Sequence, residues 1–355
     1  MVNDTASKPD LLKLASEPET TPFDYIVVGS GAGGGVLAAR LAHSGKSVLL
    51  IEAGADVAAE VQPCGEVDAP EASEAKLRLV YDVPVYYGAA SEDQEMSWSF
   101  SVRHFENTPE QQRDPKYNKE KDPAETPDPN WPTGGKGGIF YPRVSGLGGC
   151  TNHHAMIIVK PNDVDWQRVA DLTGDSSWEP SAMQGYFAKI EQVLYYAAYR
   201  SAFRKALGKI AEAWRAFIAF LSPQEQLDQG GHGHQGWQKT SFISPALIIS
   251  IAISDLTFIR VLVGAILWLL KKDGNWKAFL KAILTLSLTR FLDPNYRRDW
   301  PATPNVALKF IPIGTNGRQR VGLRDWLLKN AIDSPERLTI VTCALATRVI
   351  FKPGK

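Results

Sequence analysis

A glycine-rich turn between an apolar strand and a helix is the feature of this chain that most constrains its fold. The apolar run Tyr25–Val28 leads into the motif Gly29-x-Gly31-x-x-Gly34, and helix-forming residues follow the last glycine. A second apolar run ends in Glu52, about 20 residues after the glycines. This order of strand, glycines, helix, strand and acid is typical of a βαβ unit that binds a dinucleotide. The alternative, a glycine-rich turn in an ordinary α/β unit, accounts less well for the agreement of all five parts.

Each glycine of the motif has its own physical role. Gly29 permits the tight turn, Gly31 lets the backbone approach a pyrophosphate, and Gly34 lets the helix pack closely on the sheet. The pyrophosphate would bind the unpaired N–H groups at the positive end of the helix. The carboxylate of Glu52 can accept hydrogen bonds from both ribose hydroxyls and would repel a 2′-phosphate, so FAD or NAD is favoured over NADP. The dinucleotide contacts predicted in this unit are Gly29, Ser30, Gly31, Ala32, Gly33, Gly34, Glu52 and Ala53.

Length, charge and cysteine content limit the remaining classes. With 355 residues, the chain can bury a large core and is long enough for two domains. Its formal net charge of zero gives no reason to expect nucleic acid or an anionic membrane as a partner. The cysteines Cys64, Cys150 and Cys343 show neither metal-ligand spacing nor a paired framework. Because the N-terminus also lacks the apolar core of a signal peptide, we predict a reducing, cytoplasmic location.

Three further segments each allow two interpretations. Residues 245–270 are strongly apolar, but interrupting charges favour buried helices, or a helix at a hydrophobic entrance, over a membrane span. Residues 199–221 have the pattern of a basic amphipathic helix, which we place against a domain rather than on a membrane surface. His232 and His234 could bind a metal, but no third ligand lies near them in the sequence. We therefore predict no metal site and no membrane association.

The rest of the chain alternates between polar loops and short regular elements. Residues 106–138 form a long polar insertion, more consistent with a surface excursion than with a mobile lid. Residues 98–102 alternate as a strand would. Helices are predicted at residues 163–172, 180–193 and 323–331, and paired strands at residues 338–342 and 346–351.

A second glycine-rich segment, Gly146–His154, and its surroundings resemble the glucose–methanol–choline family of FAD-dependent oxidoreductases. In this family a basic residue precedes a glycine-pair element, and an acidic element ending in tryptophan follows it shortly. Here the corresponding residues run from Arg143 to His154 and from Asp163 to Trp166. The later residues that match the family are Trp178, Tyr186, Phe187, Glu191 and the C-terminal stretch 320–351. The resemblance covers nearly the whole chain and is loosest in residues 56–135 and 200–300.

The resemblance implies an α/β fold with a Rossmann-like FAD-binding domain and an incomplete substrate domain. The expected organisation is a flexible lead at residues 1–22, followed by the FAD-binding domain at 23–194 with its insertion. A largely helical partial substrate domain would occupy residues 195–315, and residues 316–355 would return to the FAD-binding domain.

The same resemblance assigns cofactor contacts to the second loop. In the family, this loop runs beside the flavin, and its glycines allow close backbone approach. The contacts carried over are Gly148, Gly149, Cys150, Thr151, Asn152, His153 and His154, with Ala346 meeting the adenine through its backbone. Some family members tether the flavin covalently through a histidine that matches His153. The alternative is a His153 that packs or hydrogen-bonds near a non-covalently held FAD.

The catalytic base of the family has no counterpart here. Family members use a histidine paired with a second histidine or asparagine near the end of a much longer chain. This sequence ends at Lys355, and His232 and His234 precede the strands that return to the flavin domain. We therefore assign no catalytic residue, and we expect a truncated chain that a C-terminal polypeptide could complement.

The function expected from these residues is hydride transfer from a small-molecule alcohol, aldehyde or sugar to FAD. Two other functions stay open. One is a non-catalytic FAD-binding fragment or interaction protein, which would bind FAD stably as a monomer. The other is an NAD-dependent dehydrogenase, which the βαβ unit alone would permit but the second glycine loop disfavours.

Overall fold

The computed structural model describes residues 12–13, 22–56, 58, 79–93, 96–117, 138–195, 231–242, 257, 260, 261, 264, 267, 293–296 and 310–351. The amphipathic helix expected at 199–221 lies outside these residues, as do most of the N-terminal lead, the insertion beyond residue 117 and most of the apolar stretch 245–270. The chain divides into two compact units. Unit 1 comprises Met1–Ala155 and Gly322–Lys355, and unit 2 comprises Met156–Val321.

Unit 1 is built on a parallel four-stranded sheet with the order β1-β8-β3-β2. The strands are β1 (Leu12–Lys13), β2 (Tyr25–Val28), β3 (Val48–Ile51) and β8 (Leu338–Val341). In the register, Val27 pairs with Leu50, and Leu50 pairs with Ile340. β8 enters between β1 and β3 from the far end of the sequence, so residues more than 280 positions apart share one sheet. The predicted βαβ unit and the α/β class are confirmed.

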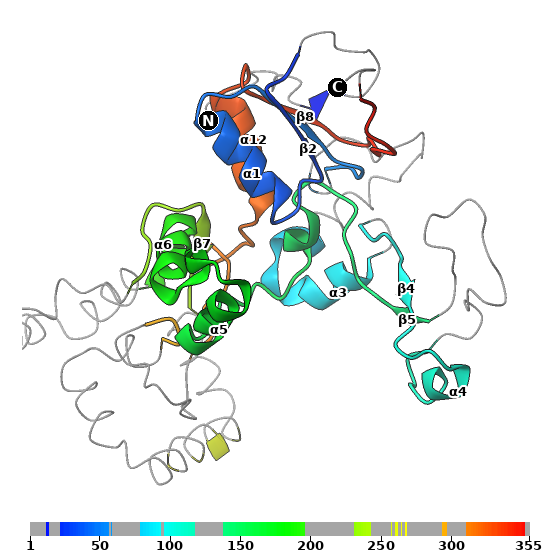
Figure 1. Ribbon diagram of the computed structural model, residues 1–355. Coiled ribbons are helices and arrows are strands. Elements are labelled where there is room, and N and C mark those ends of the chain that lie inside the picture. The colour runs from blue at the N-terminus through cyan, green and yellow to red at the C-terminus, as the bar shows by residue number, and fades with distance from the viewer. Residues whose placement is uncertain are drawn as a thin grey trace, which may run out of the picture. The chain divides into compact units, whose positions relative to one another are not determined.

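Two helices cover one face of this sheet. α1 (Gly34–His43) follows β2, and α12 (Leu323–Asp333) precedes β8. Figure 1 shows these two helices side by side against the sheet. The side chains buried between sheet and helices are Val27, Val48, Leu50, Leu338, Ile340, Ala38, Ala39, Ala42, Leu323, Leu327 and Ala331. On the opposite face of edge strand β2, Ile26 is 63% exposed and Val28 is 61% exposed. Parallel sheets usually bury both faces, and no element that the structure describes covers this one.

Short elements complete the described part of unit 1. They are η1 (Pro84–Tyr86), α3 (Tyr87–Glu92), α4 (Thr108–Gln111) and the antiparallel pair β4 (Ser101–Val102) and β5 (Ile139–Phe140). The strand predicted at 98–102 forms only at its end. The rings of Trp98 and Phe100 nevertheless stack 5.8 Å apart, as residues two positions apart on one face would.

Unit 2 contains two consecutive helices and a small parallel sheet. The helical elements are α5 (Asp163–Thr173), η4 (Ser176–Trp178) and α6 (Pro180–Ile190), and the strands are β6 (Glu191–Val193) and β7 (Gln238–Thr240). α5 begins at a capping box in which Asn162 accepts from the Val164 N–H and Asp165 accepts from the Asn162 N–H. The helix predicted at 180–193 ends three residues early, because residues 191–193 pair with β7.

Two expectations for the C-terminal region are wrong. Residues 346–350 form no strand and are exposed, and Ile350 and Phe351 are each 77% exposed. No strand in the described part of the chain pairs with them. Cys343 is disulfide-bonded, whereas Cys150 is a free thiol. The expectation of unpaired cysteines is therefore wrong for Cys343.

The apolar stretch at 245–270 is described at only five positions. Residues 257, 260, 261, 264 and 267 are helical and exposed, with Val261 at 66% and Leu267 at 60%. Among the described residues, no helix is both long and apolar enough to cross a membrane.

Candidate functional site

The turn between β2 and α1 has the geometry that the glycine motif predicts. Gly29 has a φ of 86°, and its N–H donates to the carbonyl of Ile51 at 2.8 Å, which holds the turn against the end of β3. A Cβ on Gly34 would lie 2.1 Å from the Gly29 carbonyl oxygen. The absence of side chains at these positions therefore permits both the reversal of the chain and the close packing of the helix.

The N-terminus of α1 presents backbone N–H groups without a capping side chain. Its N-cap residue is Gly33, and its first turn contains no acidic residue. Apart from each glycine's chain neighbours, no atom of the described residues lies within 4 Å of the position that a Cβ would take at Gly31 or Gly33. An anion could thus reach the positive end of the helix dipole without displacing protein atoms.

Glu52, at the end of β3, is buried and firmly held. It is 6% exposed, and Ser30 beside it is fully buried. The Ser30 hydroxyl donates to Glu52 Oε2 at 2.5 Å, and the Ser30 N–H donates to the same oxygen at 2.9 Å. The Gly54 N–H donates to Oε1 at 3.0 Å. The acid is therefore fixed next to the glycine turn before any ligand binds.

The second glycine loop packs directly on the first. A Cβ on Gly149 would lie 2.7 Å from the Cα of Gly31, so the two backbones meet at a distance that only glycine allows. The Gly148 N–H donates to the Ser30 hydroxyl at 2.9 Å. Gly148 itself has a φ of 99° and forms the N-cap of η3 (Gly149–Asn152). The two segments found separately in the sequence are therefore one structure.

Two of the residues predicted to contact the cofactor in this loop form hydrogen bonds within the loop. The Thr151 hydroxyl donates to the Gly148 carbonyl at 2.8 Å, and the Asn152 side-chain amide donates to the Leu147 carbonyl at 2.8 Å. Asn152 is fully buried, and its Oδ1 makes no hydrogen bond within the described residues. An unsatisfied buried acceptor is costly, so this oxygen suits a donor other than those that the described residues supply.

Of the other predicted cofactor contacts, all but Ala346 lie in or next to the two glycine loops. Cys150, His153 and His154 are partly buried around η3, and the N–H groups of both histidines approach the Cys150 carbonyl, at 3.4 and 3.2 Å. Ala32 is in the glycine turn, and Ala53 follows Glu52. Ala346 lies in the exposed stretch after β8, and no described contact links it to the two loops.

An ion pair that sequence reasoning missed ties the C-terminal helix to this site. The Arg324 guanidinium binds both carboxylate oxygens of Asp56, at a sequence separation of 268 residues. Burial would lower the pKa of Arg324, but the hydrogen bonds and charge of Asp56 outweigh it and raise the pKa. Arg324 also flanks Gly148, where an added Cβ would lie 3.1 Å from the Arg324 backbone nitrogen. No local pattern could reveal a pair separated by most of the chain.

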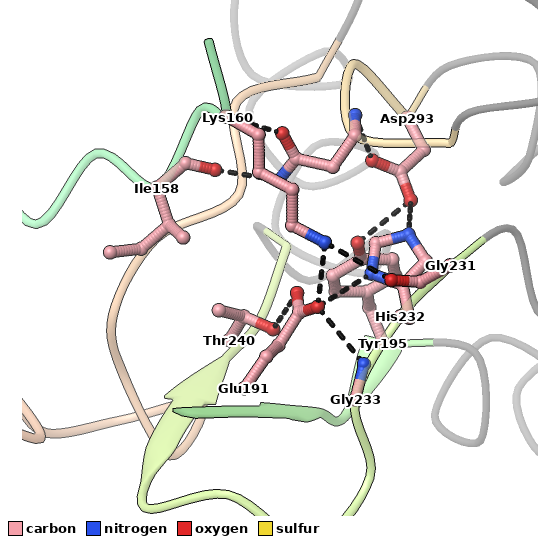
Figure 2. A network of polar contacts seen from close by, with 10 residues as sticks. Ile158, Lys160, Glu191, Tyr195, Gly231, His232, Gly233, Thr240 and Asp293 are labelled. Atoms are coloured by element: carbon pink, nitrogen blue, oxygen red, sulfur yellow. Dashed lines mark hydrogen bonds and ion pairs between the residues drawn. The ribbon is translucent and has the colours of Figure 1, made fainter. Parts of the chain in front are cut away.

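Unit 2 contains a second, separate cluster of buried charges (Figure 2). His232 Nδ1 lies 3.0 Å from Glu191 Oε2, and His232 Nε2 lies 2.9 Å from Asp293 Oδ2. Lys160 Nζ lies 3.1 Å from the same Glu191 oxygen. The remaining donors to the two carboxylates are the Gly233 N–H, the Thr240 and Tyr195 hydroxyls, and the Asn295 N–H. Four ionised groups of this kind carry no net charge, so burial of the cluster is tolerable.

The charge states within this cluster follow from its geometry. Burial would lower the pKa of His232, but hydrogen bonds to Asp293 and Glu191 outweigh that effect and raise it. Burial would raise the pKa of Glu191, but the hydrogen bond and charge of His232, with those of Lys160, lower it to about 2. His234, by contrast, is exposed. The two histidines do not meet, and the described residues contain no cluster suited to a metal ion.

Comparisons with known proteins agree with the geometry of unit 1. The model of the NAD(P)-binding Rossmann-like domain matches residues 27–100. Dehydrogenase eriK of Hericium erinaceus is 29% identical over 178 residues, which cover 50% of this chain and 22% of that protein. Pyranose dehydrogenase 3 of Leucoagaricus meleagris is 28% identical over 165 residues, covering 46% of this chain and 20% of that protein.

A solved structure extends the fold match to nearly the whole chain. Formate oxidase of Aspergillus oryzae RIB40, from work on its FAD modification, superposes with a TM-score of 0.50 and 13% identity. The match covers 95% of this chain and 41% of the oxidase. The chain thus spans about a fifth of the length of these two relatives and well under half of that structure. In sequence and in fold, it resembles the N-terminal portion of the glucose–methanol–choline family of FAD-dependent oxidoreductases.

Proposed function

We propose that this chain is the FAD-binding portion of an oxidoreductase that acts on CH–OH groups. The observation that carries the proposal is the junction of the two glycine loops at Ser30, Gly31, Gly148 and Gly149, directly beside the buried acid Glu52. An NAD-binding βαβ unit requires only the first loop and the acid. The second loop, packed on the first, supports a larger dinucleotide such as FAD.

The residues present fit the charge and shape of FAD. The uncapped N-terminus of α1 and the open space at Gly31 and Gly33 suit a pyrophosphate. Glu52 suits a ribose with free hydroxyls and disfavours a 2′-phosphate. Asn152 Oδ1 is a buried acceptor without a donor among the described residues. The pyrophosphate would thus be held by the turn 29–34, the ribose by Glu52, and the flavin side by residues 148–154.

FAD, when bound, would supply the acceptor for a hydride from the substrate. The protein groups described here would bind and orient it and exclude water from the pyrophosphate. His153, at the end of η3, is the residue we propose as a covalent tether or, in the alternative, as a polar neighbour of the flavin. Acid denaturation of flavin-loaded protein distinguishes the two, because only a covalent flavin stays with the precipitated chain.

The substrate class rests on the relatives, which include a pyranose dehydrogenase and a formate oxidase. We propose a small alcohol or sugar as the substrate, with the catalytic base supplied by a complementing C-terminal polypeptide. Two observations support such a partner: no described residue covers the outer face of β2, and Val349, Ile350 and Phe351 are exposed. Apolar surface of this kind is usually buried. Turnover of alcohols by the chain alone would contradict this division of roles.

The simplest test is the absorbance spectrum of the chain after incubation with FAD and gel filtration. Retained absorbance at about 450 nm, where oxidised flavins absorb, supports FAD binding. The match to the NAD(P)-binding domain model favours a second candidate, an NAD-dependent dehydrogenase. That candidate predicts retention of NAD, with no flavin absorbance at any FAD concentration.

A further inference from the structure

We propose that Ser30 is a positioning residue that sets the Glu52 carboxylate and the Gly148 loop in register for the adenosine half of the cofactor. This inference rests on the proposed function for the identity of the ligand. Its structural part, the coupling of the two loops through one hydroxyl, stands on the unliganded protein alone.

The hydroxyl of Ser30 is bonded to two protein groups. It donates to Glu52 Oε2 at 2.5 Å and accepts from the Gly148 N–H at 2.9 Å, and the side chain is completely buried. Because its one proton is donated to Glu52 and the side chain is completely buried, this hydroxyl is not open to a ligand. Ser30 acts on the ligand through Glu52 and Gly148 rather than by direct contact.

The hydrogen bonds on Glu52 identify the oxygen that is left for a ligand. A carboxylate can accept about four hydrogen bonds, two on each oxygen. Oε2 already accepts two, from the N–H and the hydroxyl of Ser30, whereas Oε1 accepts one, from the Gly54 N–H. The remaining acceptor site is on Oε1, which we assign to a ribose hydroxyl. Ser30 keeps the carboxylate from rotating and so keeps Oε1 directed at the ligand.

Replacement of Ser30 by alanine has two predicted effects. Glu52 loses a charge-assisted hydrogen bond and keeps only the backbone N–H groups of residues 30 and 54, so Oε1 is held less firmly. The Gly148 N–H loses its acceptor in a buried position, so the second loop opens more often. A residue that merely fills space would produce neither effect in a variant of nearly equal volume.

The first experiment is hydrogen–deuterium exchange of the unliganded chain and of Ser30→Ala. We expect faster exchange in the peptides that contain Gly148 and Gly54, and unchanged exchange in β6 and β7 of unit 2. Ser44→Ala is the matched control, because Ser44 is exposed and its hydroxyl bonds only to the Leu41 carbonyl at the end of α1. Unchanged exchange at Gly148 in Ser30→Ala would overturn the coupling.

The second experiment is a double-mutant cycle on FAD affinity with Ser30→Ala and Glu52→Gln. We expect Ser30→Ala to weaken binding about tenfold, and to weaken it by no more than about twofold when Glu52 is already replaced. Equal losses in both backgrounds would show that Ser30 does not act through Glu52. If Ser30→Ala fails to fold, Ser30→Cys, which keeps a weak donor of similar size, is used in both experiments with the same criteria.

The two experiments separate the failure of this inference from that of the proposed function. A wild-type chain that binds no FAD contradicts the proposed function, while the exchange experiment still decides whether Ser30 couples the loops. FAD binding with an additive cycle retains the proposed function and rejects the role of Ser30.

Discussion

His232 offers the most informative perturbation of unit 2, because both of its ring nitrogens face buried carboxylates. Replacement by leucine keeps a similar volume but removes one positive charge and both donors. Within the cluster of Figure 2, Glu191 would then keep Lys160 as a cationic neighbour, whereas Asp293 would lose the cation that contacts it there. Removal of one member of a buried ion pair costs about 3–5 kcal/mol.

The remaining hydrogen bonds place the expected loss at the lower end of this range. The bonds that survive come from Lys160, Gly233, Thr240, Tyr195 and Asn295. We therefore predict that His232→Leu lowers the free energy of unfolding by about 3 kcal/mol. The free energy of unfolding of the variant is measured with urea at about pH 6. Faster amide exchange in β6 and β7 would assign the loss to unit 2.

His234→Leu is the control, because His234 is exposed and lies only two residues away. Its effect should stay within about 0.5 kcal/mol. The reasoning is refuted if His232→Leu costs less than about 1 kcal/mol, or if the control costs as much as the test variant.

Three further predictions concern the pH dependence of unit 2, the ion pair between Asp56 and Arg324, and the glycine turn. The stability of unit 2 should be highest between about pH 4.5 and 6.5. Because the pKa of His232 is raised in the folded state, its contribution to stability is lost as pH rises above 6.5, and because the pKa of Glu191 is lowered, its contribution is lost as pH falls from 4.5 toward about 2. Equilibrium unfolding across pH tests this, and a flat profile in wild type would contradict it. Asp56→Asn should lower the free energy of unfolding of unit 1 by about 2–3 kcal/mol, because Arg324 loses its charged partner. The control is Asp333→Asn, which breaks the exposed pair Lys329–Asp333 and should cost less than about 1 kcal/mol in the same unfolding assay. Gly34→Ala should abolish FAD binding, because its Cβ would lie 2.1 Å from the Gly29 carbonyl oxygen. The control is Gly88→Ala in α3, where an added Cβ meets no described atom within 4 Å. This control should bind FAD nearly as wild type does in a fluorescence titration.

The parts of this fold that depend on local pattern could be predicted from the sequence. The glycines of the first turn, the apolar strands on either side and Glu52 lie within about 30 residues, so their spacing carries the geometry. The capping residues Asn162 and Gly174 likewise define α5 locally, through a side-chain acceptor and a left-handed C-terminal residue.

The parts that depend on distant pairing could not be predicted. The bond between Ser30 and Gly148 and the ion pair between Asp56 and Arg324 join residues 118 and 268 positions apart. The sequence left His232 without any predicted partner, because its two carboxylate partners come from β6 and from residue 293. The predicted strand at 346–351 was wrong because an apolar sequence forms a strand only where a neighbouring strand can pair with it.

The central claim is that the junction of the two glycine loops binds FAD with Glu52 on the ribose, and one titration tests it most directly. FAD and NADP are titrated separately into the wild-type chain and into Glu52→Gln, with protein fluorescence as the signal. The account predicts that wild type binds FAD and excludes NADP, and that Glu52→Gln binds FAD about tenfold more weakly and excludes NADP less strongly. Binding of NADP by the wild-type chain as tight as that of FAD, or FAD affinity unchanged in Glu52→Gln, would contradict it.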